Sequence, residues 1–255
     1  MSDIPFPAAT VTSEAPALTQ IQRVIYTFTA PSMTFNDIKR NSSWWMPLLI
    51  TIATGILLFF AITTKVTWQQ IYENNQQNMP QWAKDLQDKQ PPEARAQAQK
   101  MGPITQEITW ALSPIGLFIL DAIGAGILLA TINFGFGGKA KFFDIFAVEW
   151  YAGLVSWVIK FLFGTAAIFA GLPGESFRPE NVAGTNLGFY LNQQETPKAL
   201  YVLATAIDPF VIWTLVLTSI GVAIVAGTKR SAGYIAVFGW WGLFTLLFVG
   251  LAAAF

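Results

Sequence analysis

The sequence contains no cysteine and no histidine among its 255 residues. Their absence excludes disulfide bonds, metal sites built from thiolate or imidazole ligands, and haem ligation by either side chain. It also excludes every catalytic arrangement in which histidine acts as the base. We therefore expect no cofactor and no metal site, and we find no constellation of residues that indicates an enzyme.

Charge is also scarce. Charged residues make up 12% of the chain and hydrophobic residues 53%, whereas about a quarter of a soluble domain is charged. Fifteen basic residues balance fifteen acidic ones, so the chain lacks the basic excess of a nucleic-acid-binding protein. Together with several uncharged runs long enough to cross a bilayer, this composition predicts an integral membrane protein.

The N-terminal part of the chain lacks the basic segment and apolar run of a cleavable signal peptide. Residues 1–16 are rich in proline and small polar residues, which predicts a flexible tail. Residues 17–43 carry apolar side chains at helical spacing, and we expect an amphipathic interfacial segment on the membrane surface. Pro31 is expected to end its first helix, and a capping box from Thr34 to Asp37 is expected to open a second short turn.

Five apolar runs predict an all-α fold, in which residues 44–255 form a polytopic membrane domain with a bundle of five transmembrane helices. A polar connection, residues 65–110, follows the first run and carries five basic and five acidic residues. We interpret it as a solvated extramembrane loop, in which residues 91–100 form a helix that starts with proline. The predicted spans are 47–64, 111–133, 145–172, 200–226 and 234–255.

The basic residues of the short loops are distributed unevenly. The N-terminal segment and the turns at 134–144 and 227–233 together carry seven of them, and five spans place all three segments on the same side. Because basic short loops are retained in the cytoplasm, the N-terminus is predicted to be cytoplasmic and the C-terminus to lie outside.

Four ionisable residues lie within the predicted spans. Asp121, Lys160 and Asp208 are about eight to twelve residues from the outer ends of their spans, so their depths differ by roughly 6 Å at 1.5 Å per residue. A charge in hydrocarbon costs about 2.5–3.5 kcal/mol even on the lenient insertion scale, and we therefore predict that these three side chains form an intramembrane charge cluster. Glu149 is nearer the cytoplasmic end of its span and is assigned a secondary role.

The expected cluster has a structural and a functional interpretation. In the structural one, it orients three helices within the bundle. In the functional one, the acid left over after Lys160 is paired forms a proton or ion site. Pro209, the other secondary residue, leaves the carbonyl of Thr205 without its helical hydrogen bond and is expected to kink the fourth span beside Asp208.

Three stretches carry recognisable patterns. Residues 30–47 contain a Pro-x-x-x-Phe segment ahead of the first span, and residues 137–152 contain a glycine-rich turn into the third span. Residues 207–221 follow the pattern Asp-x-Phe-x-x-Trp-x-x-x-Leu-x-x-x-Gly. Together these stretches resemble the YIP1 family of five-span membrane proteins, and the last resembles its bacterial branch. The chain departs from the family at 155–156, where Val-Ser stands in place of a frequent Leu-Pro.

The resemblance implies a non-enzymatic protein of a bacterial cytoplasmic membrane that organises the membrane or binds partner proteins, as eukaryotic members do in vesicle trafficking. Its expected partners are the lipid bilayer, other membrane proteins or a second copy of the chain, and not nucleic acid. The alternative is a small ion- or proton-coupled transporter or channel that uses Asp121, Lys160 and Asp208. Five spans argue against this alternative, because they do not divide into two equal inverted repeats.

Overall fold

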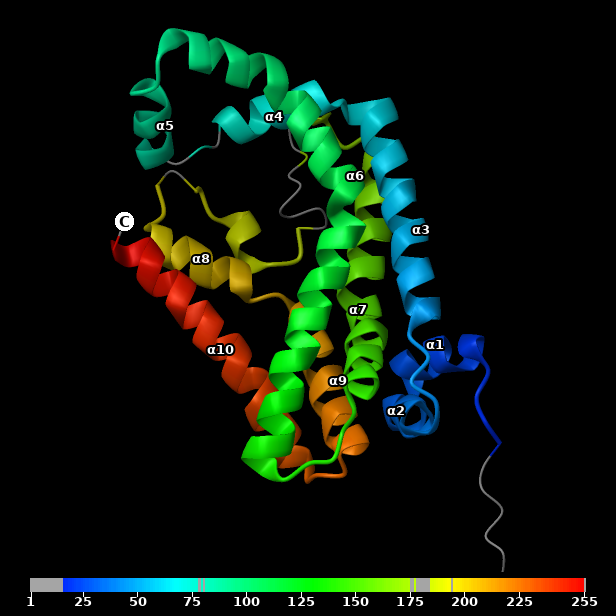
Figure 1. Ribbon diagram of the computed structural model, residues 1–255. Coiled ribbons are helices and arrows are strands. Elements are labelled where there is room, and N and C mark those ends of the chain that lie inside the picture. The colour runs from blue at the N-terminus through cyan, green and yellow to red at the C-terminus, as the bar shows by residue number, and fades with distance from the viewer. Residues whose placement is uncertain are drawn as a thin grey trace, which may run out of the picture.

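The computed structural model describes residues 16–77, 79, 81–174, 177, 184–193 and 195–254, and within these residues the protein is helical (Figure 1). Apart from Pro16, the tail predicted at residues 1–16 lies outside the described residues. The helices are α1 (Gln20–Thr29), α2 (Pro31–Arg40), α3 (Trp45–Ala61), α4 (Trp68–Gln77), α5 (Gln81–Asp88), α6 (Pro92–Ala130), α7 (Phe142–Phe169), α8 (Lys198–Ala206), α9 (Pro209–Ala226) and α10 (Arg230–Ala254).

Short helical turns of other types extend or connect these helices. A π-helical turn, η1 (Ile62–Val66), continues α3, and a second, η2 (Thr131–Gly135), continues α6. A 3₁₀ turn, η5 (Leu187–Tyr190), precedes α8.

Five helical segments within the described residues are long and apolar enough to cross a membrane, which confirms the predicted fold class. They are Trp45–Val66, Pro92–Gly135, Phe142–Phe169, Pro209–Ala226 and Arg230–Ala254.

Helix α7 is the centre of the bundle and packs against α3, α6 and α9. Its first half is largely buried, and Ile145, Tyr151 and Val155 have no exposed surface. Because lipid is as apolar as these side chains, close packing rather than exclusion from water holds such helices together. Small residues make this possible on α9, where a β-carbon added at Gly221 would collide with Val148 of α7.

The two N-terminal helices pack against the bundle. Phe35 and Ile38 of α2 are fully buried against α7 and α9. Pro31 does separate the two helices, but it also begins α2, because its fixed φ suits the first helical position. Thr34 and Asp37 lie inside this helix, so the expected capping box between them is wrong.

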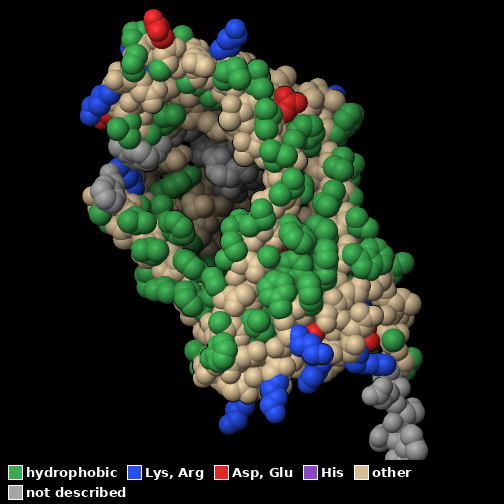
Figure 2. Space-filling model, in the orientation of Figure 1, with side chains coloured by type: hydrophobic (Ala, Val, Ile, Leu, Met, Phe, Trp, Pro, Cys, Tyr) green, Lys and Arg blue, Asp and Glu red, His purple; other side chains and the backbone are tan. Residues whose placement is uncertain are grey.

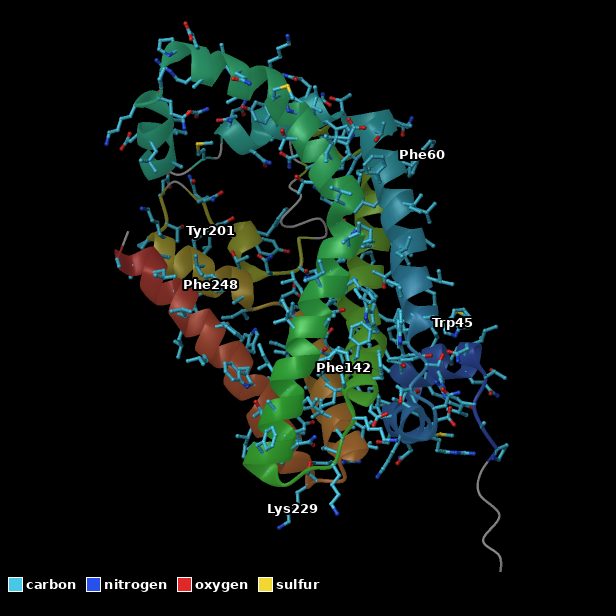
Figure 3. The ribbon with its side chains drawn as sticks, in the orientation of Figure 1. Trp45, Phe60, Phe142, Tyr201, Lys229 and Phe248 are labelled. Atoms are coloured by element: carbon cyan, nitrogen blue, oxygen red, sulfur yellow. The ribbon has the colours of Figure 1, made fainter. Side chains whose placement is uncertain are left out.

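The two short turns of the bundle lie at the same end as α1 and α2 (Figure 1). Trp45 and Lys229 mark this end, and Phe60 lies toward the opposite one (Figure 3). Lys and Arg side chains gather at the turn end, and hydrophobic side chains cover the helices beyond it (Figure 2). The basic residues there include Lys139, Lys141, Lys229 and Arg230.

The connection at residues 65–110 contains α4, α5 and the beginning of α6, and it lies at the end opposite the basic turns (Figure 1). The expected helix after Pro91 is present, but it runs without a break into the second span, through Pro103 and Pro114. Residue 110 is therefore no structural boundary. Helix α4 packs against α6, where the hydroxyl of Tyr72 donates to the carbonyl of Ala98 at 3.2 Å.

The fourth predicted span, 200–226, is two helices rather than one kinked helix. Helix α8 ends at Ala206, the backbone is extended at Ile207 and Asp208, and α9 begins at Pro209. Only α9 is long enough to span. The break follows from Pro209, which has no N–H to continue a helix and is favoured as the first residue of a new one.

Candidate functional site

The first charged site in the membrane domain is an ion pair between α7 and the start of α9. Lys160 Nζ lies 2.8 Å from Asp208 Oδ2, and the exposed fractions of the two side chains are 23% and 1%. The hydroxyl of Thr185 donates to the same carboxylate oxygen at 2.5 Å. The other oxygen, Oδ1, accepts the backbone N–H groups of Phe210 and Val211 at 2.8 and 3.2 Å. Both oxygens of Asp208 are therefore occupied.

Asp208 is the N-cap of α9, one residue before the membrane-spanning segment begins. Burial opposes ionisation of its carboxyl group, but hydrogen bonds from Lys160 and Thr185, the charge of Lys160 and the N–H of Val211 outweigh burial. The pKa of Asp208 is consequently held below its usual value. The positive end of the α9 dipole favours the anion in the same direction. This arrangement suits a fixed ionised anchor and not a group that exchanges protons near neutral pH.

The second site is a cavity of about 240 Å³ between α6, α7, α9 and α10. Asp121 of α6 and Glu149 of α7 both line it. Among the described residues, no ion pair joins Asp121 to Lys160 or Asp208, so the structure brings together only two members of the expected cluster of three. Similar depth was not sufficient to predict the contact, because residues at one depth can face different sides of a bundle.

Glu149 lies deeper in the bundle than its secondary role suggested. Its Oε2 atom is buried and has no hydrogen-bond partner among the residues that the structure describes, although buried polar atoms are paired in the large majority of cases. Gly124 of α6 leaves room for this side chain, because a β-carbon added there would lie 2.8 Å from Glu149 Oε1. The glycine thus admits a carboxylate between α6 and α7.

Aromatic side chains form much of the remaining wall of this cavity. Trp157 comes from α7, and Trp240, Trp241 and Phe244 come from α10. The indole N–H of Trp240 donates to the hydroxyl of Thr131 at 2.9 Å, which fixes this ring against the end of α6. Within the described part of the chain, no group of three or more acidic, cysteine or histidine side chains is placed to hold a metal ion.

A second buried ion pair, which has no counterpart among the sequence predictions, joins α1 to α2. Arg23 Nε lies 2.7 Å from Asp37 Oδ2, and both side chains are buried. The guanidinium also donates to the carbonyl of Asn41 at 2.9 Å. The hydroxyls of Thr27 and Thr34 donate to the backbone carbonyl of Arg23 at 2.8 and 2.9 Å.

This pair is connected to the bundle by further hydrogen bonds. The hydroxyl of Tyr151 of α7 donates to Gln20 Oε1 of α1 at 2.7 Å, and Ser42, which follows α2, donates to Asp144 at the start of α7. The two N-terminal helices are thus held against α7 by polar contacts as well as by apolar ones. An arginine and an aspartate fourteen residues apart carry no periodic signal, so the sequence pattern does not predict their contact.

Comparison with known families matches a model described as "Yip1 domain" to residues 25–251. The match begins inside α1 and ends inside α10, so it includes both charged sites of the membrane domain. No match was found among curated proteins or among solved structures.

Proposed function

Because the chain belongs to the Yip1-domain family, whose members are generally non-enzymatic proteins of membrane traffic, we propose that it is a scaffold that binds partner proteins in the membrane. The partners are other membrane proteins or a second copy of the chain. A bacterial cytoplasmic membrane is the proposed location, on the resemblance of residues 207–221 to the bacterial branch of the family.

The observation that carries the proposal is the exposed apolar side chains of α1. Its buried residues, Arg23 and Thr27, are polar, whereas Ile21 and Ile25 point outward with exposed fractions of 64% and 51%. Met33, at the start of α2, is 50% exposed. Val24 and Phe28 of α1 pack on the core of the bundle, so the two isoleucines form a separate outer face, which is stable when it meets an apolar environment.

The buried contacts of Arg23 also make the outer surface rigid. Ion pairing to Asp37 and hydrogen bonding to Asn41 fix α1 relative to α2, and Phe35 fixes α2 on the bundle. A surface already held in one conformation loses less entropy when it binds. We assign the face formed by Ile21, Ile25 and Met33 as the partner contact, and contact with lipid alone is the competing outcome.

Photo-crosslinking in native membranes tests this assignment. A photoreactive residue at Ile25 is expected to yield a discrete protein adduct, whereas one at Phe248, an exposed residue of α10, yields lipid adducts only. Adding Arg23→Met to the protein that carries the photoreactive residue at Ile25 should greatly reduce the protein adduct, because α1 loses its fixed position. Identical lipid-only labelling at both positions would reject the partner contact.

We further propose that the end carrying α1, α2 and the two short turns is cytoplasmic. The clustering of Lys and Arg at this end supports it (Figure 2). Since the chain has no cysteine, single substitutions report orientation cleanly. Glu93→Cys should react with a membrane-impermeant maleimide in intact cells, and Lys229→Cys should react only after permeabilisation. The reverse pattern would invert the topology.

The alternative, ion- or proton-coupled transport through Asp121, Lys160 and Asp208, has weaker support. Lys160 and Asp208 neutralise each other. Asp121 lies apart from this ion pair, in the lining of the cavity between α6, α7, α9 and α10. The observation in its favour is the buried Oε2 atom of Glu149, which has no hydrogen-bond partner in the described part of the chain. A pH-dependent ion flux in liposomes that disappears in Asp208→Asn would favour transport over scaffolding, and partner binding that is unaffected by this substitution would favour scaffolding.

A further inference from the structure

The cavity between α6, α7, α9 and α10 is lined by two acidic side chains, and no Lys or Arg is among its lining residues. Asp121 and Glu149 both line it, and Glu149 Oε2 is buried without a hydrogen-bond partner. Lys160 of α7, whose helix also carries Glu149, is paired with Asp208. A buried charge in a membrane needs a counter-charge or a proton, so this cavity requires one or the other.

The walls of the cavity favour a cation over a proton alone. Three tryptophans and a phenylalanine line it, and protonation of a carboxyl group does not require aromatic side chains nearby. Cations bind over the faces of aromatic rings, best over tryptophan, and cages of such rings recognise alkylated ammonium groups. The residues are Trp157, Trp240, Trp241 and Phe244.

A small metal ion fits this lining poorly. Calcium takes six to eight oxygen ligands, whereas two acidic side chains line this cavity. The remaining polar groups of the lining, Thr214 and Thr218, already direct their hydroxyls to backbone carbonyls of α7 and α9. An organic cation needs few oxygen ligands and gains from contact with apolar surface.

Size and position indicate how such a cation would enter. A volume of about 240 Å³ is below the 300–1,000 Å³ usual for a complete drug-sized ligand, so it suits an ammonium head with its tail outside. Near the basic turns α10 contacts η2, the continuation of α6, and toward the C-terminus its path diverges from that of α6 (Figure 1). Phe244, on the diverging part of α10, is 42% exposed. An apolar tail can therefore extend into the bilayer between these two helices.

We propose that this cavity binds the alkylated ammonium group of an amphiphile, with Asp121 and Glu149 as counter-charges and the tryptophans as its aromatic wall. The ammonium group belongs either to a free alkylammonium or to a zwitterionic lipid headgroup. A free cation fits better, because the phosphate of a lipid headgroup would be repelled by two carboxylates. The inference does not depend on the scaffold function, since it concerns a different part of the protein.

Thermal unfolding of the full chain in dodecyl maltoside micelles tests the proposal, with decyltrimethylammonium as the probe. A ligand that binds the folded state stabilises it by an amount that grows as ln(1 + [L]/Kd), which raises the unfolding midpoint. We expect the probe to stabilise the native protein. Glu149→Gln should weaken apparent binding by about tenfold or more, because it removes a carboxylate counter-charge. Trp241→Leu should weaken it by about three- to tenfold, because it removes a cation–π contact. Glu73→Gln, which removes an acid of α4 outside the cavity, should bind as the native protein does.

Gly124→Ala provides a variant that keeps every charge and ring. The added β-carbon would meet the flexible end of Glu149 and displace it, so probe binding should fall while the protein stays folded. Decylphosphocholine distinguishes the two sources of the ammonium group: preference for the cationic probe supports a free alkylammonium, and equal binding supports a lipid headgroup. Equal stabilisation of the native protein, Glu149→Gln and Gly124→Ala by decyltrimethylammonium would overturn the proposal.

Discussion

The contact between Lys160 and Asp208 makes a quantitative prediction, because a single aspartate performs two separable tasks. It pairs with Lys160, and it caps α9 through Oδ1. Asparagine caps a helix about as well as aspartate, so Asp208→Asn removes the charge and keeps the cap, whereas Asp208→Ala removes both. The difference between the two variants should equal the loss of a cap, about 1 kcal/mol within a range of 0.5–2 kcal/mol.

The charge itself is expected to contribute more than the cap. Removing one partner of a buried ion pair costs about 3–5 kcal/mol when the other remains buried. Lys160 is 23% exposed and can turn its head toward water, so we expect about 2–3 kcal/mol for Asp208→Asn, below that range. Lys160→Met should cost a similar amount, because it leaves the carboxylate of Asp208 buried without its cation.

Combining the two substitutions separates pairing from other effects. The double variant Asp208→Asn/Lys160→Met contains neither charge, so it should be more stable than the sum of the single losses by about 1–3 kcal/mol. Denaturant unfolding in detergent, with each variant measured under the same conditions, gives the four free energies of the cycle. Strictly additive losses would refute the claim that these residues stabilise the fold through each other.

The pH dependence of the same stability has a defined sign. Because the pKa of Asp208 is lowered by folding, its contribution is complete above the ordinary value of 3.8 and is lost as the pH falls through the lower folded value. The native protein should therefore lose stability in acid more steeply than Asp208→Asn, and both should be insensitive to this group at neutral pH. Parallel acid unfolding curves would contradict the assignment.

Two further substitutions test contacts elsewhere in the fold by thermal unfolding. Arg23→Met should lower the free energy of unfolding by about 3 kcal/mol, because Asp37 stays buried without its main partner. Arg40, whose Nη1 lies 3.8 Å from Asp37 Oδ1, replaces that partner only in part. A loss below about 1 kcal/mol would contradict a stabilising ion pair. Gly221→Ala should cost about 1–3 kcal/mol through overpacking, whereas Gly126→Ala, where nothing lies within 4 Å of an added β-carbon, should cost nothing; equal effects would contradict the close contact.

The number and type of the membrane helices could be predicted from the sequence, because the bilayer requires an uncharged helix of a fixed minimum length. The limits of the fourth span could not be predicted from hydropathy, since α8 and α9 are both apolar. The boundary between α8 and α9 was indicated instead by the residue types at the junction. Asp followed by Pro is a favoured N-cap and first helical residue, and this signal at Asp208 predicts the start of a helix as well as it predicts a kink.

The partners of the charged residues were harder to predict than their depth. Asp121 and Lys160 have similar predicted depths, yet they lie in different sites, because the rotation of each helix about its axis decides which neighbour a side chain meets. That rotation is set by packing details such as Gly124 beside Glu149. No single sequence pattern encodes a glycine on one helix together with a carboxylate on another.

The buried charges therefore fall into two classes with opposite expected responses to neutralisation. Asp208 has a cation and three hydrogen-bond donors, so Asp208→Asn should destabilise the protein. Glu149 Oε2 has no hydrogen-bond partner among the described residues, so Glu149→Gln breaks no hydrogen bond at this atom, and the unfolding midpoint should be unchanged or higher because an ionisable group is removed from the interior. Unfolding of both variants without added amphiphile measures this contrast. Destabilisation of Glu149→Gln to the level of Asp208→Asn would mean that Glu149 is neutralised within the fold itself, and Asp121 alone would then remain in the cavity as a counter-charge for a ligand.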